Sequence, residues 1–133
     1  MNETAIMKEV YGQMLVELGK EYKNLVVLDA DLAVANRTSL FREKFPDRFF
    51  NVGIAEQNMI SIAAGFATTG LIPIAHSIAV FATGRCFGQI RQSVAYSRMN
   101  VKIVGGYAGF TAQQDGASHQ SVIDIAIMRA LPN

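Results

Sequence analysis

The sequence contains few of the residues that build disulfides or metal centres. Its 133 residues include one cysteine, two histidines, three prolines and no tryptophan. The single cysteine, Cys86, excludes an internal disulfide and an all-cysteine metal site, and we expect it to fill space in the core. Neither histidine has a carboxylate at ligand spacing. We therefore expect no metal site held by this chain alone.

Charge is also scarce, at 17% of residues, compared with about a quarter in typical soluble domains. The formal net charge is +1 and no cluster of Lys and Arg stands out. This argues against nucleic acid or an anionic membrane surface as a partner. Half of the residues are hydrophobic. That is more apolar surface than one small core needs, which predicts a large interface with another chain.

The longest uncharged stretch runs from Gln57 to Gly84, but it does not have the character of a membrane span. Gly65, Gly70 and Pro73 interrupt it, whereas a spanning helix requires about 20 mostly apolar residues. We interpret it as a buried helix, a turn and a buried strand. Residues 1–4 lack the basic and apolar parts of a secretion signal, so we expect a cytoplasmic location.

Predicted strands and helices alternate along the chain. Apolar residues recur at helical spacing over residues 6–18, and near-continuous apolar runs predict buried strands. The pattern predicts one α/β domain over residues 1–133, with a doubly wound, mostly parallel sheet and helices on both faces. Ser121 and Asp124 are spaced like a capping pair. Predicted helices cover residues 6–18, 38–45, 55–67, 82–96 and 121–129, and predicted strands cover residues 24–28, 48–52, 71–75 and 101–104.

Polar residues follow several predicted strands, where ligands gather in folds of this kind. There is no phosphate-binding glycine motif and no glycine-flanked serine nucleophile. The residues at or beyond these strand ends are Asp29, Asp31, His76, Ser77, Asp115 and His119.

Glu56 is the residue that most requires an explanation. It directly precedes the uncharged stretch, so its carboxylate is expected at the margin of the apolar interior. An unpaired charge there would cost on the order of several kcal/mol, so Glu56 must find a partner, hold a proton or hydrogen-bond a ligand. The alternative is that Glu56 caps the first turn of the following helix, where the helix dipole favours negative charge.

Four segments carry a family resemblance: residues 29–32 (DADL), 53–59 (GIAEQNM), 79–85 (AVFATGR) and 115–121 (DGASHQS). Together and in this order they resemble the pyrimidine-binding domain of transketolases, most closely the C-terminal section of split transketolases. The resemblance covers essentially the whole chain. It implies a thiamine diphosphate-dependent transferase that moves a two-carbon ketol unit from a ketose to an aldose.

The resemblance also implies partners. The diphosphate-binding domain, or an N-terminal section of the same enzyme, would supply magnesium and the diphosphate contacts. A C-terminal domain would complete the protein, and the active site would lie between the subunits of a homodimer. The isolated chain is therefore expected to be inactive.

The resemblance assigns roles to individual residues. Glu56 matches the glutamate that hydrogen-bonds the 1′ nitrogen of the aminopyrimidine and promotes proton transfer. Phe81 matches the aromatic residue that stacks on the pyrimidine, and Ile78 matches a second wall of that pocket, where relatives often carry phenylalanine. Asp31 matches an acidic residue near the cofactor and the subunit contact. For Phe81 the alternative is a core side chain, and for Asp31 a strand-end turn.

Asp115 and His119 match residues that contact the hydroxyl groups of the sugar, and we count His119 with Glu56 among the catalytic candidates. Their alternative is a polar loop leading into a helix. His76 has no motif behind it and is predicted to be a hydrogen-bonded structural histidine.

Departures from the family pattern concern the substrate, and in one of them Gln113-Gln114 replaces the usual Gly-Glu before Asp115. Ala35 and Tyr107 stand where sugar-phosphate transketolases commonly have a phosphate-binding serine and histidine. Both changes reduce anion recognition. The runner-up interpretations are a domain of 1-deoxyxylulose-5-phosphate synthase or of an oxo-acid dehydrogenase beta chain, and a non-catalytic assembly partner.

Overall fold

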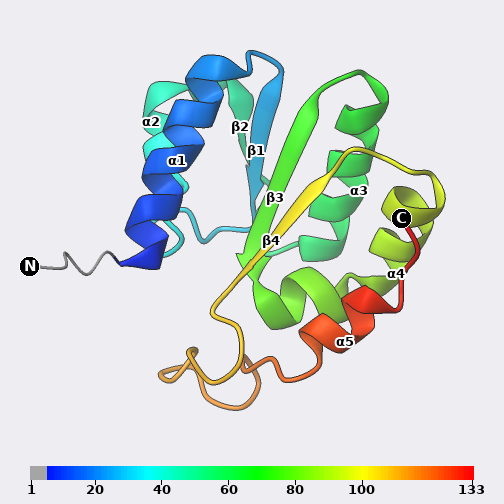
Figure 1. Cartoon of the computed structure of the whole chain (residues 1–133). Helices are drawn as coiled ribbons and strands as arrows, with labels where there is room; N and C mark the ends of the chain where they lie inside the picture. The colour runs from blue at the N-terminus through cyan, green and yellow to red at the C-terminus, as the bar shows by residue number, and fades with distance from the viewer. Residues whose placement is uncertain (1–5) are drawn as a thin grey trace, which may run out of the picture.

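Four parallel strands form one sheet in the order β2-β1-β3-β4 in the computed structural model, which describes residues 6–133 (Figure 1). The residues considered for a secretion signal lie outside this range. Every residue of β1 is buried, as expected for an apolar strand covered on both faces. The strands are β1 (Leu25–Asp29), β2 (Phe49–Asn51), β3 (Ile72–Ile78) and β4 (Lys102–Gly106).

Helices cover both faces of the sheet (Figure 1). On one face, α1 (Met7–Glu21) and α2 (Ser39–Lys44) pack on side chains of β1 such as Val27. On the other face, α3 (Glu56–Thr68) packs on Leu28, and the helical segment after β3 extends this layer. The prediction of a doubly wound parallel α/β domain is therefore confirmed. The remaining elements are the 3₁₀ turn η1 (Pro46–Arg48), η2 (Phe81–Arg85), α4 (Phe87–Gln89), η3 (Ile90–Tyr96) and α5 (Asp124–Arg129).

The predicted elements are all present, but the segment after β3 is not the regular α-helix expected over residues 82–96. It consists of the π-helical turn η2, the short helix α4 and a second π-helical stretch, η3. A π-helical turn holds more residues than an α-turn, and such turns often occur at functional sites. Phe81 and Arg85 are the first and last residues of η2.

The predicted capping pair at the last helix is wrong. Helix α5 begins only at Asp124, and its N-cap residue, Ile123, makes no side-chain cap. Ser121 instead pairs with Gly109: each backbone N–H donates to the other residue's carbonyl oxygen, at 2.9 and 3.1 Å. The backbone of Ser121 therefore closes a loop over residues 109–121, three residues before the helix.

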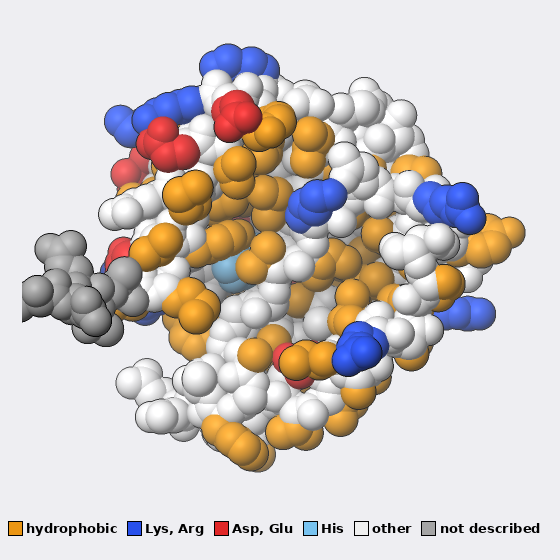
Figure 2. Space-filling view, in the orientation of Figure 1, with side chains coloured by type: hydrophobic (Ala, Val, Ile, Leu, Met, Phe, Trp, Pro, Cys, Tyr) orange, Lys and Arg blue, Asp and Glu red, His pale blue; other side chains and the backbone are white. Residues whose placement is uncertain are grey.

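The surface retains a large apolar component. Figure 2 shows hydrophobic side chains spread in a broad band over one face, with a few charged side chains among them. No helix within residues 6–133 has the length and apolar content required to span a membrane. The most exposed large hydrophobic residues, each at least 60% exposed, are Ile6, Met7, Val34, Ile54, Tyr96, Phe110, Val122 and Ile125.

Candidate functional site

Glu56 occupies the first position of α3 and is only 3% exposed. It lies in the first turn of α3, where the helix dipole favours its charge, but no side-chain hydrogen bond caps the helix at its N-cap residue, Ala55. Oε2 of Glu56 instead accepts a hydrogen bond from Nη1 of Arg85 at 2.7 Å, and the Ser77 hydroxyl lies 3.5 Å from Oε1. The buried carboxylate thus meets the requirement for a partner by forming an ion pair.

Arg85 also lies over the ring of Phe81, with 3.9 Å between the guanidinium carbon and the ring centroid. This arrangement is a cation–π contact. The ring of His119 meets Phe81 edge to face, with 4.9 Å between the centroids. Arg85 therefore contacts Glu56 and Phe81 at once, and His119 packs on the same phenylalanine ring.

A cavity of about 430 Å³ opens beside Glu56. Its lining includes Arg85 and Gln57, whose side-chain amide donates to the backbone carbonyl of Arg85 at 3.1 Å. Glu56 offers a buried acceptor at this cavity, and Arg85 links it to the face of Phe81. An acceptor and an aromatic face suit a flat, nitrogen-bearing ring such as the aminopyrimidine. Cys86, the residue after Arg85, is fully buried. Burial and the nearby Glu56 raise the pKa of its thiol to about 11, while Arg85 acts in the opposite direction. This thiol is not a reactive group.

Asp31 and Ile78 lie at or just beyond strand ends, and neither lines this cavity. Ile78 is the last residue of β3 and is 7% exposed. Asp31 is exposed and has a left-handed backbone, with φ of 64°. Asn51 donates to Oδ1 of Asp31 at 3.0 Å, and the Asp31 N–H donates back to Oδ1 of Asn51 at 3.1 Å. The same Asn51 oxygen accepts from the N–H of Gly53, so this pair supports the loop that leads to α3.

Asp115 and His119 lie on the loop over residues 109–121. Asp115 is exposed, and no hydrogen bond or ion pair within residues 6–133 joins it to Glu56. Ser118 lies 3.5 Å from the carbonyl oxygen of Asp115 and 2.9 Å from Nδ1 of His119. Gly109 and Ser121 close this loop, within which His119 packs on Phe81 and Asp115 is exposed to solvent.

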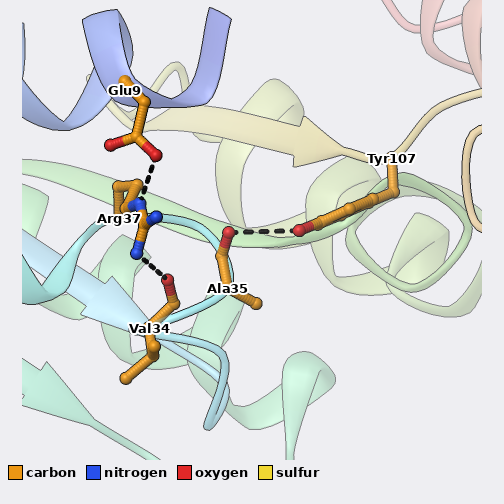
Figure 3. Close-up of polar contacts among 5 residues, drawn as sticks. All are labelled: Glu9, Val34, Ala35, Arg37 and Tyr107. Atoms are coloured by element: carbon orange, nitrogen blue, oxygen red, sulfur yellow. Dashed lines mark hydrogen bonds and ion pairs between the residues drawn. The ribbon is translucent and has the colours of Figure 1, made fainter. Parts of the chain in front are cut away.

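Two of the residues that depart from the family pattern touch each other (Figure 3). The Tyr107 hydroxyl donates to the carbonyl oxygen of Ala35 at 3.1 Å, and Tyr107 has a left-handed φ of 54°. On the other side of the same loop, Nε of Arg37 pairs with Glu9 of α1 at 2.7 Å, and Arg37 also lies 3.5 Å from the Val34 carbonyl. The loop after β1 is therefore tied to both α1 and the end of β4.

His76 lies inside β3 and is 3% exposed. The prediction of a structural histidine is consistent with this burial, but the predicted hydrogen bonding is wrong: neither ring nitrogen has a partner within residues 6–133. Burial lowers the pKa of His76 to about 4, so the ring is neutral at pH 7. It packs edge to face on Tyr11, with 4.9 Å between centroids, at a cavity of about 280 Å³ between α1 and β4.

Asp29 is a fully buried carboxylate whose role the sequence did not indicate. Its oxygens accept hydrogen bonds from the Thr38 hydroxyl at 2.7 Å and from the Leu32 N–H at 2.5 Å. Burial raises the pKa of Asp29, while these two hydrogen bonds act in the opposite direction. Asp29 therefore anchors the loop between β1 and α2. Within residues 6–133 no group of three or more His, Cys, Asp and Glu side chains is arranged to hold a metal ion.

Fold and site together define a parallel α/β domain that presents a buried carboxylate and an aromatic ring at the edge of its sheet. The chain belongs to the transketolase pyrimidine-binding domain family, whose family model matches residues 3–133.

Individual relatives agree with this assignment. The chain is 59% identical over 127 residues to a protein of Methanocaldococcus jannaschii described as a transketolase C-terminal section, a match over 96% of this chain and 40% of the relative. It is 42% identical to a 6-deoxy-6-sulfo-D-fructose transketolase subunit of Clostridium sp. MSTE9, over 95% of this chain and 39% of that protein. The chain thus spans about 40% of the length of these curated relatives.

Solved structures show the same fold. A split-gene transketolase, solved as an inactive beta4 tetramer, superposes with a TM-score of 0.81 at 54% identity, over 95% of this chain and 40% of that one. A Pichia stipitis transketolase in complex with sedoheptulose 7-phosphate superposes with a TM-score of 0.87 over 99% of this chain and 21% of that one. Its 21% identity bears on the fold alone.

Proposed function

We propose that this chain supplies the aminopyrimidine half of a thiamine diphosphate site in a transketolase that transfers a two-carbon ketol unit from a ketose to an aldose. The observation that carries the proposal is the carboxylate of Glu56, 3% exposed at a cavity and joined through Arg85 to the ring of Phe81. Membership in the pyrimidine-binding family supports it.

In this proposal each residue has a defined task. Glu56 accepts a hydrogen bond from the aminopyrimidine, and its low exposure makes it suited to sharing a proton with a ring nitrogen. Phe81 offers a face for stacking, and Ile78 forms an aliphatic wall. When bound, thiamine diphosphate supplies the carbon nucleophile of the reaction. His119, next to Phe81, is placed to contact a sugar hydroxyl, and Asp115 would do so from the exposed part of the same loop.

The partners of this chain belong to the proposal as well. An N-terminal section carrying the diphosphate-binding domain would hold magnesium and the diphosphate. The relative described as a C-terminal section supports this division. Exposed apolar side chains such as Met7 and Phe110 support association of this chain with itself, as in a homodimer, and the related beta4 assembly is consistent with it. We place the enzyme in the cytoplasm.

The substrate is where this chain differs from sugar-phosphate transketolases. Ala35 offers no hydroxyl group, and the Tyr107 hydroxyl already donates to the Ala35 carbonyl oxygen. The Ala35 side chain therefore cannot donate to a phosphate, and Tyr107 could donate only by breaking its contact with the Ala35 carbonyl. We propose a reduced preference for phosphorylated sugars. The related subunit named for a sulfonated fructose is compatible with a donor other than a sugar phosphate.

The decisive experiment replaces Glu56 by Gln in the assembled enzyme. An amide cannot share a proton with the aminopyrimidine, so exchange of the cofactor's thiazolium proton for deuterium should slow by about a hundredfold to ten-thousandfold. Circular dichroism checks that the fold is retained. Glu43→Gln, which makes the same change at an exposed position of α2, is the matched control. If Glu56→Gln exchanges the proton at the parent rate, Glu56 has no role in the chemistry.

A further inference from the structure

Arg85 makes two contacts at once, and both are with residues that the proposed function gives to the cofactor. Nη1 of Arg85 lies 2.7 Å from Oε2 of Glu56, and the same guanidinium lies 3.9 Å from the centroid of the Phe81 ring. A guanidinium is a flat, nitrogen-bearing group that donates hydrogen bonds in its own plane. An aminopyrimidine is also flat and nitrogen-bearing.

The two groups compete for one position. A ring that stacks on Phe81 and also reaches Glu56 must use the face of Phe81 that is turned toward the carboxylate. Arg85 covers that face, because one side chain makes both contacts. Resting on the proposed function, we infer that Arg85 is a placeholder for the aminopyrimidine: its guanidinium occupies the ring's position and swings into solvent when the ring binds.

The exposures of the two partners determine which one moves. The Arg85 side chain is 43% exposed, whereas the Glu56 side chain is 4% exposed. Arg85 can rotate into water at little cost, but a buried carboxylate left without a partner is strongly destabilised. The partner must therefore be exchanged rather than lost: one proton taken up from solvent, shared between the incoming ring nitrogen and Oε2 of Glu56, provides the new hydrogen bond.

The backbone at this position is held independently of the side chain. The Gln57 amide donates to the Arg85 carbonyl oxygen at 3.1 Å, and Arg85 ends the π-helical turn that begins at Phe81. The guanidinium can thus leave while η2 keeps Phe81 in place. Before the cofactor binds, the same ion pair holds the Glu56 side chain in its orientation.

The test is a titration of the 133-residue chain with thiamine, followed by calorimetry and by NMR. Arg85→Ala removes the competitor, so the affinity for thiamine should rise about tenfold relative to the parent. Arg85→Lys keeps the charge but cannot lie flat on Phe81, and it should fall between the two. Arg91→Ala, an exposed position on η3, is the matched control and should bind like the parent. In the parent, the Nε–H resonance of Arg85 should shift toward that of a solvated arginine as thiamine binds.

Each result decides a different point. Tighter binding by Arg85→Ala together with the shift of the Arg85 resonance supports the placeholder. Equal or weaker binding by Arg85→Ala and Arg85→Lys, or no binding of thiamine by any variant, overturns the placeholder and leaves the proposed function standing. The proposed function itself fails if the Glu56→Gln variant of the assembled enzyme exchanges the thiazolium proton at the parent rate. Thermal unfolding of each variant separates loss of binding from loss of fold.

Discussion

Protonation of His76 should make the stability of this domain fall steeply in weak acid. The ring is 3% exposed, and burial lowers its pKa from 6.5 to about 4. Between these two values the unfolded chain binds a proton that the folded chain does not. Stability is therefore fully present above pH 6.5, declines as the pH falls, and this loss is complete once the pH passes below the folded pKa.

The size of the effect follows from the shift. Each unit of pKa is worth about 1.4 kcal/mol, so a shift of about 2.5 units removes about 3 kcal/mol from the free energy of unfolding. This is a large share of the roughly 5–15 kcal/mol typical of a domain. Asp29 contributes in the opposite direction, since a raised pKa favours the folded state at low pH. Its contribution is common to parent and variant and cancels in their difference.

Urea unfolding followed by circular dichroism from pH 7.5 to pH 3.5 measures the effect. His76→Gln should lose about 3 kcal/mol less than the parent over this range. The parent chain, unfolded in the same pH series, is the reference. If His76→Gln and the parent lose stability in parallel, burial does not hold this histidine neutral and the reasoning is refuted.

Further predictions concern packing, association and substrate. Gly19→Ala should cost about 1–3 kcal/mol in urea unfolding, because a Cβ there would lie 2.5 Å from the Phe45 ring. Gly65→Ala, whose Cβ would meet no neighbouring atom within 4 Å, should instead stabilise the chain by about 0.5–1 kcal/mol. Equal effects of the two changes would contradict the close packing of Gly19 on Phe45. Sedimentation equilibrium of the chain should show a dimer or larger species; a monomer would mean that exposed apolar surface alone does not drive association. In the assembled enzyme, Ala35→Ser with Tyr107→His should raise the preference for a phosphorylated over an unphosphorylated ketose at least tenfold, and an unchanged ratio of specificity constants would exclude a role in phosphate recognition.

Much of the fold could be predicted from local patterns. The buried strand over residues 24–28 is a continuous apolar run, and it is observed as β1 at Leu25–Asp29. The helix expected over residues 55–67 is α3, shifted by one residue. In contrast, nothing in the apolar spacing of residues 82–96 distinguishes a π-helical turn from an α-helix, since both bury one face.

The resemblance predicts Glu56, Phe81 and His119 as candidate residues, but it predicts neither Arg85 nor the contacts that join them. Glu56 was recognised as a carboxylate in need of a partner, yet the partner, Arg85, comes 29 positions later and depends on the packing of η2 against α3. Likewise, the position of His119 beside Phe81 depends on a tertiary loop closure. Such pairings depend on tertiary structure, so the spacing of residues along the sequence does not predict them.

The π-helical turn η2 also affects how this chain can be compared with others. A residue in an α-helix advances by about 100°, so one added residue in a turn rotates everything on one side of it relative to the other. A gap-free alignment through Phe81–Arg85 to a relative with regular α-helix here can place either end of the turn in register, but not both. Residue roles in this segment should therefore be transferred between relatives by structural superposition. A gap-free sequence alignment would assign the roles at one end of the turn to residues one position away.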